Sequence, residues 1–188
     1  VPTPILTQPI KLGADIVLHS CSKYLNGHGD LIGGAVVVAE GRENVLKDIQ
    51  NIRNEYGGVL GSFEAWLLLR GMRTLAVRVK TASTSALKIA EFLDSCEMVQ
   101  QVLYPGLRRH NGHVVAAKQM RGGFGGMLSF RVEGGEYAAK LLASKVNIFR
   151  QAISFGSTES VIEHRAGLEK GDLSTPRDML RVSVGLEN

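Results

Sequence analysis

Lys23 lies between two hydroxyl side chains in the stretch HSCSKYLNGHGDLIGG, residues 19–34, and this combination could support amine chemistry. The apolar run before it predicts a buried strand over residues 13–20, so that Lys23 follows the strand's carboxyl end. A lysine partly withdrawn from water can offer the neutral amine that forms a Schiff base. Ser20 and Ser22 would add hydroxyls, and the following glycines would let backbone N–H groups approach a phosphate. The same spacing also fits an ordinary solvated loop lysine.

The composition is that of an ordinary globular protein. Hydrophobic residues make up 44% and charged residues 21% of the 188 positions, and the net charge is +4. The basic residues are scattered among acidic ones without a run of five, so we expect no nucleic-acid partner. The longest uncharged apolar stretch, AWLLL at residues 65–69, is too short to cross a bilayer, and we expect no membrane segment.

The cysteines and histidines do not suggest a disulfide framework or a metal site. Cys21 and Cys96 are far apart and form no CxxC pair, which favours a reducing, cytoplasmic location. His110 and His113 lack an obvious third ligand, so no metal is predicted. The chain begins at Val1 rather than at methionine and enters a loop and a strand at once, which we interpret as the start of a fragment.

Strands and helices are expected to alternate along the chain. Apolar runs predict strands, and apolar residues spaced three and four apart predict helices. The strands are expected over residues 13–20, 35–39, 98–107, 122–135, 146–156 and 179–188. Helices are expected over residues 42–57, 74–96 and 136–145, and residues 58–71 are expected to form a loop and then a helix. Ser62 is a plausible N-cap of the second helix, and the strand before Pro105 is expected at a sheet edge.

The long amphipathic helix over residues 74–96 divides the chain into two predicted domains. Its length suits a connector, and the character of the sequence changes after it. We therefore predict one domain over residues 1–72 and a second over residues 73–188. The alternation of strands and helices in both parts indicates the α/β class.

The segment GADIVLHSCSKYLNGHGDLIGG, residues 13–34, closely resembles the cofactor-lysine segment of the Cys/Met-metabolism family of pyridoxal-phosphate enzymes. This family includes cystathionine γ-synthase, cystathionine lyases, methionine γ-lyase and O-acylhomoserine sulfhydrylase. Its pattern is a strand, Ser-x-Thr-Lys-Tyr, Gly-His and Gly-Gly, and here Ser22 stands at the threonine. The resemblance continues in order through FEAWLLLRGMRTLAVR, VLYPGL, GGFGGMLSF, ISFGSTESVIEH and LRVSVGLE.

The resemblance implies a fold and a cofactor. The fold would be that of fold-type I pyridoxal-phosphate transferases, also called aminotransferase-like, with part of the large cofactor domain followed by the small C-terminal domain. The cofactor would be pyridoxal 5'-phosphate. Lys23 would hold it as a Schiff base and then move protons on the substrate, while Ser20 and Ser22 would bind its phosphate.

The resemblance also implies a site for an amino-acid substrate. Arg181 in LRVSVGLE matches the family's arginine for the α-carboxylate, and a planar guanidinium can bind both oxygens of that group. Ser154 in ISFGSTES matches a serine near the same carboxylate. Phe155 and Ser157 stand where leucine and glycine are common in the family.

Two departures from the family limit what the resemblance implies. The family's N-terminal half, which supplies the glycine-rich phosphate turn, the ring-stacking tyrosine and an aspartate for the pyridine nitrogen, is absent, so we expect the fragment itself to be inactive. Arg165 takes the place of a proline in a loop that lies near the substrate entrance in the family. The choice between lyase and synthase therefore stays open.

The resulting hypothesis is a trans-sulfuration enzyme that acts by β- or γ-elimination or γ-replacement on sulfur amino acids or O-acylhomoserine. Another fold-type I enzyme, such as an aminotransferase, is one alternative, and a non-catalytic truncated homologue is another. By the family's habit, the complete protein is expected to form a homotetramer built from dimers.

Overall fold

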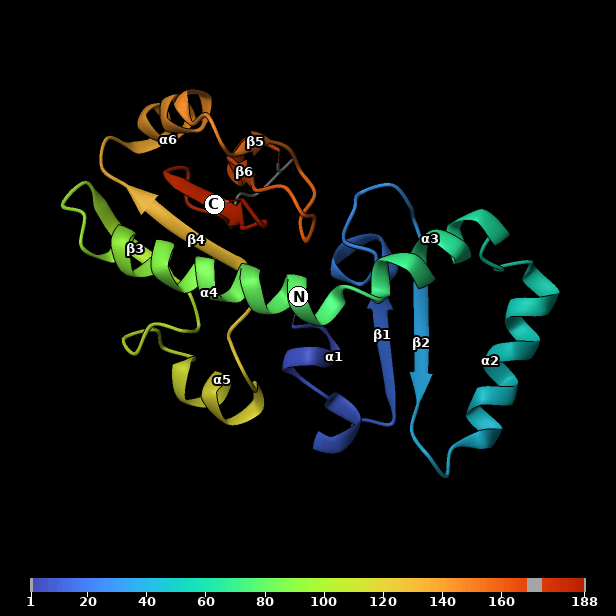
Figure 1. Ribbon diagram of the computed structural model, residues 1–188. Coiled ribbons are helices and arrows are strands. Elements are labelled where there is room, and N and C mark those ends of the chain that lie inside the picture. The colour runs from blue at the N-terminus through green and yellow to red at the C-terminus, as the bar shows by residue number, and fades with distance from the viewer. Residues whose placement is uncertain (1, 169–173, 188) are drawn as a thin grey trace.

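The computed structural model describes residues 2–168 and 174–187, and Figure 1 shows the arrangement of its elements. The α-helices are α1 (Thr3–Leu6), α2 (Glu43–Tyr56), α3 (Ser62–Met72), α4 (Leu75–Asp94), α5 (His113–Gln119) and α6 (Gly135–Lys145). The strands are β1 (Ile16–Ser20), β2 (Gly34–Val38), β3 (Val99–Leu103), β4 (Met127–Val132), β5 (Arg150–Gln151), β6 (Val161–Glu163) and β7 (Met179–Ser183). Three short helical turns complete the set: η1 (Pro9–Leu12), η2 (Cys21–Leu25) and η3 (Arg165–Gly167).

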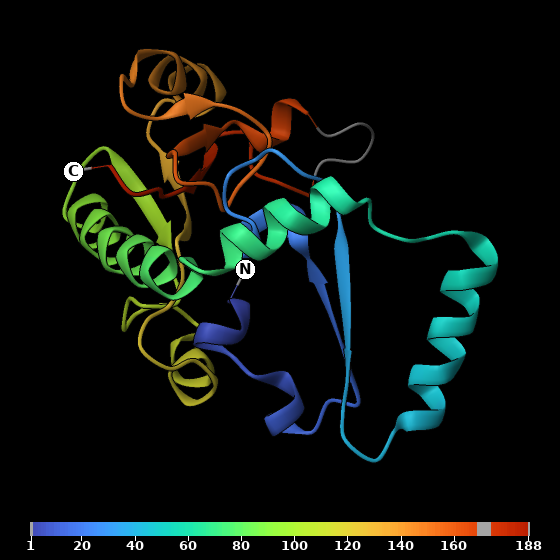
Figure 2. The same ribbon diagram turned by 45° about the vertical axis from the view of Figure 1, so that its right-hand side comes forward.

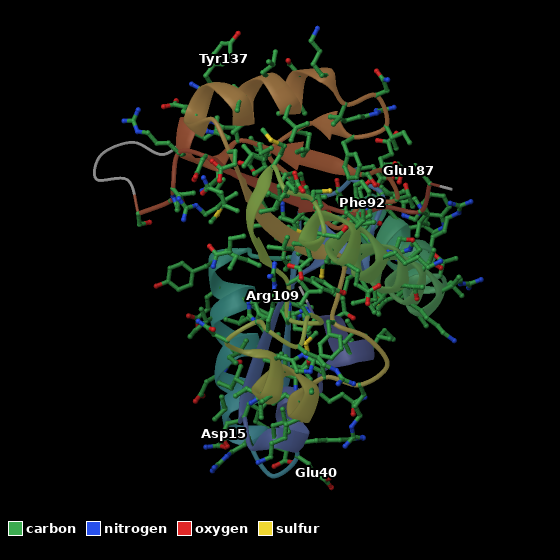
Figure 3. The ribbon with its side chains drawn as sticks, turned by 90° about the vertical axis from the view of Figure 1, so that its left-hand side faces the viewer. Asp15, Glu40, Phe92, Arg109, Tyr137 and Glu187 are labelled. Carbon is green, nitrogen blue, oxygen red and sulfur yellow. The ribbon has the colours of Figure 1, made fainter. Side chains whose placement is uncertain are left out.

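The strands form two separate sheets. β1 and β2 pair antiparallel, whereas the larger sheet has the order β3-β4-β7-β6-β5 and is antiparallel except between β5 and β6. The helix α4 runs from the neighbourhood of the small sheet along the large one, and α2 stands beyond β2 in both ribbon views (Figures 1 and 2). In the side view, Asp15 and Glu40 mark the end of the molecule opposite to Tyr137 (Figure 3).

The main core lies between the large sheet and the helices α4 and α6. β4 alternates strictly, with Leu128, Phe130 and Val132 buried, because successive side chains of a strand point to opposite faces. α4 packs against β3 and β4, and α6 packs against β4 and β7. The buried residues of α4 include Ala86 and Ala90, whose small side chains let the helix approach the sheet closely.

The sequence placed most elements correctly but missed some. The predicted connector helix is α4, and β3 lies at a sheet edge as expected. The helix α5 and the strand β6 were not anticipated, and the strand expected over residues 146–156 is reduced to β5. α3 begins at Ser62 itself, so its N-cap is Gly61 and the serine side chain makes no capping bond. The division into domains over residues 1–72 and 73–188 remains a prediction.

The prediction that residues 13–20 form a buried strand is right about the strand and wrong about its burial. β1 starts at Ile16, and the side chain of Leu18 is 77% exposed. A strand is buried only when another layer covers its face, and among the described residues no layer covers Leu18. No helix in the described part of the chain is both long and apolar enough to cross a membrane.

Candidate active site

The Lys23 loop begins where β1 ends, as the sequence predicted. After Ser20 the backbone turns through η2, in which Lys23 departs from helical geometry with φ −100° and ψ −133°. Gly33 closes the loop, since its carbonyl accepts a hydrogen bond from the N–H of Cys21 at 2.8 Å. The hydroxyl of Ser22 accepts the Gly33 N–H at 3.0 Å and lies 3.4 Å from the Gly33 carbonyl. Ser22 thus holds the loop itself together.

A buried arginine, Arg78, forms hydrogen bonds with the backbone of this loop. Arg78 on α4 is only 6% exposed, and its guanidinium donates to the carbonyls of Tyr24 at 2.8 Å, Leu25 at 3.2 Å and Gly71 at 2.7 Å. Burial lowers the pKa of Arg78 from its usual value. The sequence analysis missed this residue, although Arg78 lies three positions after Leu75 on the predicted apolar face of the helix, where a charged residue is unusual.

The amine of Lys23 contacts a residue that is distant in the sequence. Its Nζ donates a hydrogen bond to the Ser154 hydroxyl at 3.1 Å, across 131 positions of sequence. The same Nζ lies 4.6 Å from the centre of the Phe155 ring, within range of a cation–π interaction. Ser20, Lys23 and Phe155 line one small cavity together with Leu18 of β1 and Thr3 of α1. The amine is therefore accessible at a cavity rather than enclosed.

The turn that carries Ser154 is anchored on two sides. The N–H of Gly156 donates to the Ser183 hydroxyl of β7 at 2.9 Å, and the N–H of Thr158 donates to the carbonyl of Gly27 at 3.0 Å. Gly156 has φ +80°, and a Cβ at this position would lie 2.7 Å from the ring of Tyr24. Only glycine fits this turn without strain or displacement of its neighbour.

A carboxylate near the C-terminal end of the described chain holds the same turn. Glu187 accepts hydrogen bonds from the Ser160 N–H at 2.6 Å and the Ser160 hydroxyl at 2.8 Å. Burial opposes its ionisation, but the hydrogen bonds from Ser160 and from the backbone of Leu186 and Glu187 together outweigh it and lower the pKa of Glu187. The end of the chain thereby fixes the segment that presents Ser154.

Arg181 lies in the middle of β7, opposite Glu163 of β6. Its Nη2 donates to the carbonyl of Ile153 at 3.0 Å and forms an ion pair with the Glu163 carboxylate. Its guanidinium carbon lies 5.4 Å from the centre of the Phe155 ring, and a quarter of its side chain is exposed. The Phe155 ring is therefore close to both Lys23 and Arg181.

Tyr24 and Phe155 form the apolar side of this cluster. Their ring centres are 6.5 Å apart and the rings are tilted by 50°. Burial raises the pKa of Tyr24 to about 12, so the phenol stays neutral at physiological pH. The sequence had marked Phe155 only as a departure from the pattern of the family it resembles, and the structure places this ring between Lys23 and Arg181.

Four of the five predicted site residues lie around one cluster. Lys23, Ser154 and Arg181 surround the Phe155 ring, and Ser20 lines the cavity beside Lys23. Ser22 is engaged with Gly33 in its own loop. The chemical roles assigned to these residues remain predictions. Among the described residues, no group of three or more His, Cys, Asp or Glu side chains could hold a metal ion.

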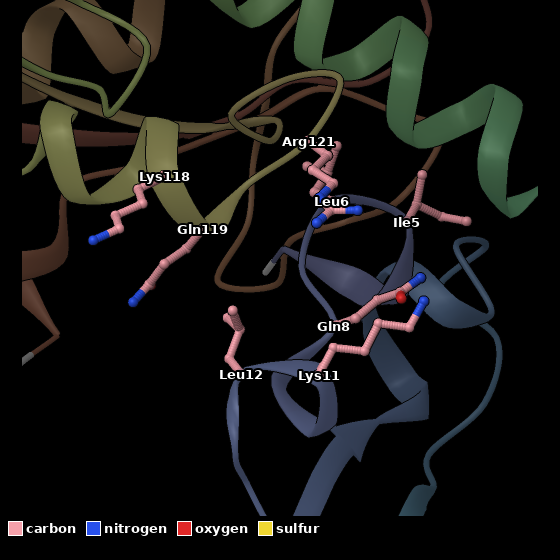
Figure 4. Close-up of a pocket in the computed structure, with 8 residues that line it drawn as sticks. All are labelled: Ile5, Leu6, Gln8, Lys11, Leu12, Lys118, Gln119 and Arg121. Atoms are coloured by element: carbon pink, nitrogen blue, oxygen red, sulfur yellow. The ribbon is translucent and has the colours of Figure 1, made fainter.

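A second cavity lies away from this cluster, between η1 and α5. Lys11, Lys118 and Arg121 line it, together with the amides of Gln8 and Gln119. Figure 4 shows that Lys11 and Lys118 extend in opposite directions, so their charges do not converge on one point. None of the predicted site residues lines this cavity.

Comparison with known proteins identifies the relatives of this chain. A family model described as "Cys/Met metabolism PLP-dependent enzyme" matches residues 1–188. The cystathionine gamma-synthase of Mycobacterium tuberculosis is 44% identical over 191 residues, which cover 99% of this chain and 48% of that protein. The cystathionine beta-lyase of Lactococcus lactis is 42% identical over 193 residues, which cover 98% of this chain and 50% of that protein.

A solved structure shows the same fold. The crystal structure of metB from Corynebacterium glutamicum superposes with a TM-score of 0.94 at 44% identity, covering 100% of this chain and 49% of that one. This match confirms the fold class expected from the sequence. The chain spans about half the length of the curated relatives it matches.

Proposed function

Because this chain belongs to the Cys/Met-metabolism family of pyridoxal-phosphate-dependent enzymes, we propose that the protein containing it is a trans-sulfuration enzyme. It would act by β- or γ-elimination or γ-replacement on sulfur amino acids or O-acylhomoserine. Relatives named cystathionine gamma-synthase and cystathionine beta-lyase support this range of reactions. One observation carries the proposal. The Lys23 amine forms a hydrogen bond with Ser154, and both Lys23 and Arg181 lie near the Phe155 ring.

The residues around Lys23 fit pyridoxal phosphate. A primary amine at an accessible cavity can bind the aldehyde of this cofactor covalently, and the exposed Ser20 hydroxyl at the same cavity can donate to a phosphate oxygen. Ser22 would have to give up its contact with the Gly33 carbonyl to donate to the phosphate as well. When bound, the cofactor supplies an electron-accepting ring that stabilises negative charge on the substrate carbon.

The side chains of this chain would bind the substrate and move its protons. Lys23 would take a proton from the substrate carbon and return it to a neighbouring one, because its amine is held at the cavity by Ser154. Arg181, whose side chain is a quarter exposed, would bind the α-carboxylate through its guanidinium. The Phe155 ring would favour positive charge on Arg181 and exclude water from the space between Arg181 and Lys23.

The proposal extends to the setting of the protein. Residues 1–72 would contribute to the large cofactor domain, and residues 73–188 would form the small C-terminal domain. The two free cysteines, Cys21 and Cys96, are compatible with the cytoplasm as its location. We further propose a homo-oligomer built from dimers, with a small amino-acid substrate and neither nucleic acid nor membrane as a partner.

The test is the Lys23→Ala variant of the protein at the length of its relatives. The unaltered protein should show the visible absorbance of covalently bound cofactor and should turn over cystathionine, methionine or an O-acylhomoserine. Lys23→Ala should lose both, because no other group replaces the amine. Lys47→Ala, which alters an exposed lysine on α2, is the matched control. An unaltered protein without bound cofactor overturns the proposal, and transamination alone would favour an aminotransferase.

A further inference from the structure

Glu163 is a buried carboxylate that the proposed reaction does not use. Its side chain is only 3% exposed, and it lies on β6 directly opposite Arg181 of β7. Opposite residues of an antiparallel pair point to the same face of the sheet, so the two side chains meet. A buried charge is costly unless it is paired, and this one is paired with the predicted substrate-binding arginine.

Two cations share the Glu163 carboxylate. Oε2 forms the ion pair with Nη2 of Arg181, and Oε1 lies 3.3 Å from Nη1 of Arg165, the first residue of η3. Arg165 thus balances part of the negative charge, and Arg181 keeps positive charge for another partner. Arg165 also stands where the family that the sequence resembles tends to have a proline.

The contacts of Arg181 occupy one end of its guanidinium. Nη2 donates to Ile153 and contacts Glu163, whereas Nε and Nη1 have no hydrogen-bond acceptor among the described residues. Glu163 is almost completely buried and Arg181 is a quarter exposed, so the carboxylate lies on the protected side of the guanidinium. The N–H groups of Nε and Nη1 are therefore left to bind a ligand.

We propose that Glu163 is a positioning residue that orients Arg181 toward the carboxylate of an amino-acid substrate held at Lys23. This inference rests on the proposed function, since it assigns a partner to the proposed substrate-binding arginine. When Glu163 already holds the guanidinium of Arg181 in place, Arg181 loses less side-chain freedom on binding a carboxylate than an unrestrained arginine would. The substrate therefore binds more tightly. Glu163 itself does not touch the substrate.

The experiment compares two amines that differ only in the carboxylate. Glycine carries the amine and the carboxylate, and methylamine carries the amine alone. The dissociation constants of both are measured on the cofactor-loaded protein at the length of its relatives, from the change in cofactor absorbance. Both values report only the folded, loaded fraction, so partial unfolding reduces the amplitude of the signal and leaves the constants unchanged.

Glu163→Gln should weaken glycine binding about tenfold and leave methylamine binding unchanged, because it removes the negative charge that pairs with Arg181 and alters nothing at Lys23. Glu136→Gln is the matched control, since Glu136 also contacts two cations, Lys140 at 2.6 Å and Arg177 at 2.9 Å, but lies on the surface at α6. This control should leave both constants unchanged.

Three outcomes would overturn the inference: unchanged or tighter glycine binding in Glu163→Gln, equal weakening of both amines, or a variant with no folded fraction. The last would assign Glu163 to the stability of the sheet rather than to Arg181. The Arg181→Lys variant separates this failure from failure of the proposed function. If the unaltered protein and Arg181→Lys prefer glycine over methylamine to the same degree, the proposed role of Arg181 itself is wrong.

Discussion

The loop that carries Lys23 is held by Arg78, a residue that does not line the cavity beside Lys23. The backbone of the Lys23 loop exposes carbonyl groups toward the interior, and Arg78 satisfies those of Tyr24 and Leu25. The same guanidinium reaches Gly71 at the end of α3 and Thr74 just before α4. One buried cation therefore joins the loop to the two helices that follow it.

The first prediction concerns this cation. Arg78→Met keeps much of the side-chain volume but leaves the buried carbonyls of Tyr24 and Leu25 without their donor, so we expect the free energy of unfolding to fall by about 2–4 kcal/mol. Urea denaturation measures the change. Arg73→Met, which alters an exposed arginine of the same segment, should change the stability little. A stable Arg78→Met variant that retains its cofactor would show that the loop does not need Arg78.

At the scale of elements, the site is formed where the turn after β5 packs on the turn after β1. Gly156 makes this approach possible, because its left-handed backbone passes directly against Tyr24. The larger sheet holds the turn through Ser183 of β7, and the ion pair between Arg131 of β4 and Asp178 fixes the start of β7. Sheet stability and site geometry are therefore coupled.

The second prediction separates strain from contact at Gly156. Gly156→Ala should destabilise the protein by about 2–4 kcal/mol, because the new methyl group meets Tyr24 and the backbone has a positive φ. Gly57→Ala is the matched control, since Gly57 has φ +71° but open space around its Cβ position. It should cost only about 1 kcal/mol. Equal losses in thermal or urea unfolding would contradict the proposed contact with Tyr24.

The third prediction concerns acid. Asp178 accepts two hydrogen bonds at 2.9 Å from Arg131, and these bonds hold the pKa of the Asp178 carboxyl below its usual range. A lowered folded pKa gives stability that is present above the unfolded pKa of about 4 and is lost as the pH falls through the folded value. Asp178→Asn should therefore lower stability at neutral pH and weaken its dependence on pH below about 4.

The measurement for Asp178 is the free energy of unfolding as a function of pH. Asp15→Asn is the control, because Asp15 pairs with Arg42 at 2.8 Å while both side chains are largely exposed. Exposed pairs contribute little, so this variant should follow the unaltered protein. An Asp178→Asn curve parallel to that of the unaltered protein would refute the assigned role.

At the scale of the whole molecule, burial is uneven. The five-stranded sheet has a continuous core, whereas the β1–β2 sheet and the helices beside it expose large apolar side chains. Leu18 is 77% exposed and Ile32 is 87% exposed, and α3 adds Phe63 and Trp66. Exposed apolar patches beside unpaired strand edges favour association with other protein surfaces.

The fourth prediction follows from this exposure. The 188-residue polypeptide, prepared by itself, should self-associate and bind a hydrophobic dye. Leu18→Lys combined with Ile32→Lys should reduce both effects, whereas Val114→Lys on α5, at an apolar side chain of similar exposure, should not. Sedimentation velocity provides the measurement. A polypeptide that stays monomeric and binds no dye would contradict the importance of these surfaces.

The sequence by itself determined the local elements and the place of Lys23. β1, β2, α4 and the position of Lys23 just after β1 follow from residues within a few positions of one another, since periodicity and turn chemistry are local properties. The ordered motifs also pointed to the family, which the family model confirms. The short strand β6 and the helix α5 were not predicted, because the periodic pattern of apolar residues in each is weak.

Only the tertiary structure decided which side chains meet. The contact between Lys23 and Ser154 spans 131 positions, and Glu163 faces Arg181 only because β6 and β7 pair in that register. Arg78 is a support of the loop because α4 packs beneath it, and Leu18 is exposed because no described layer covers β1. Burial and long-range contact depend on how elements pack together, and no local stretch of sequence contains that information.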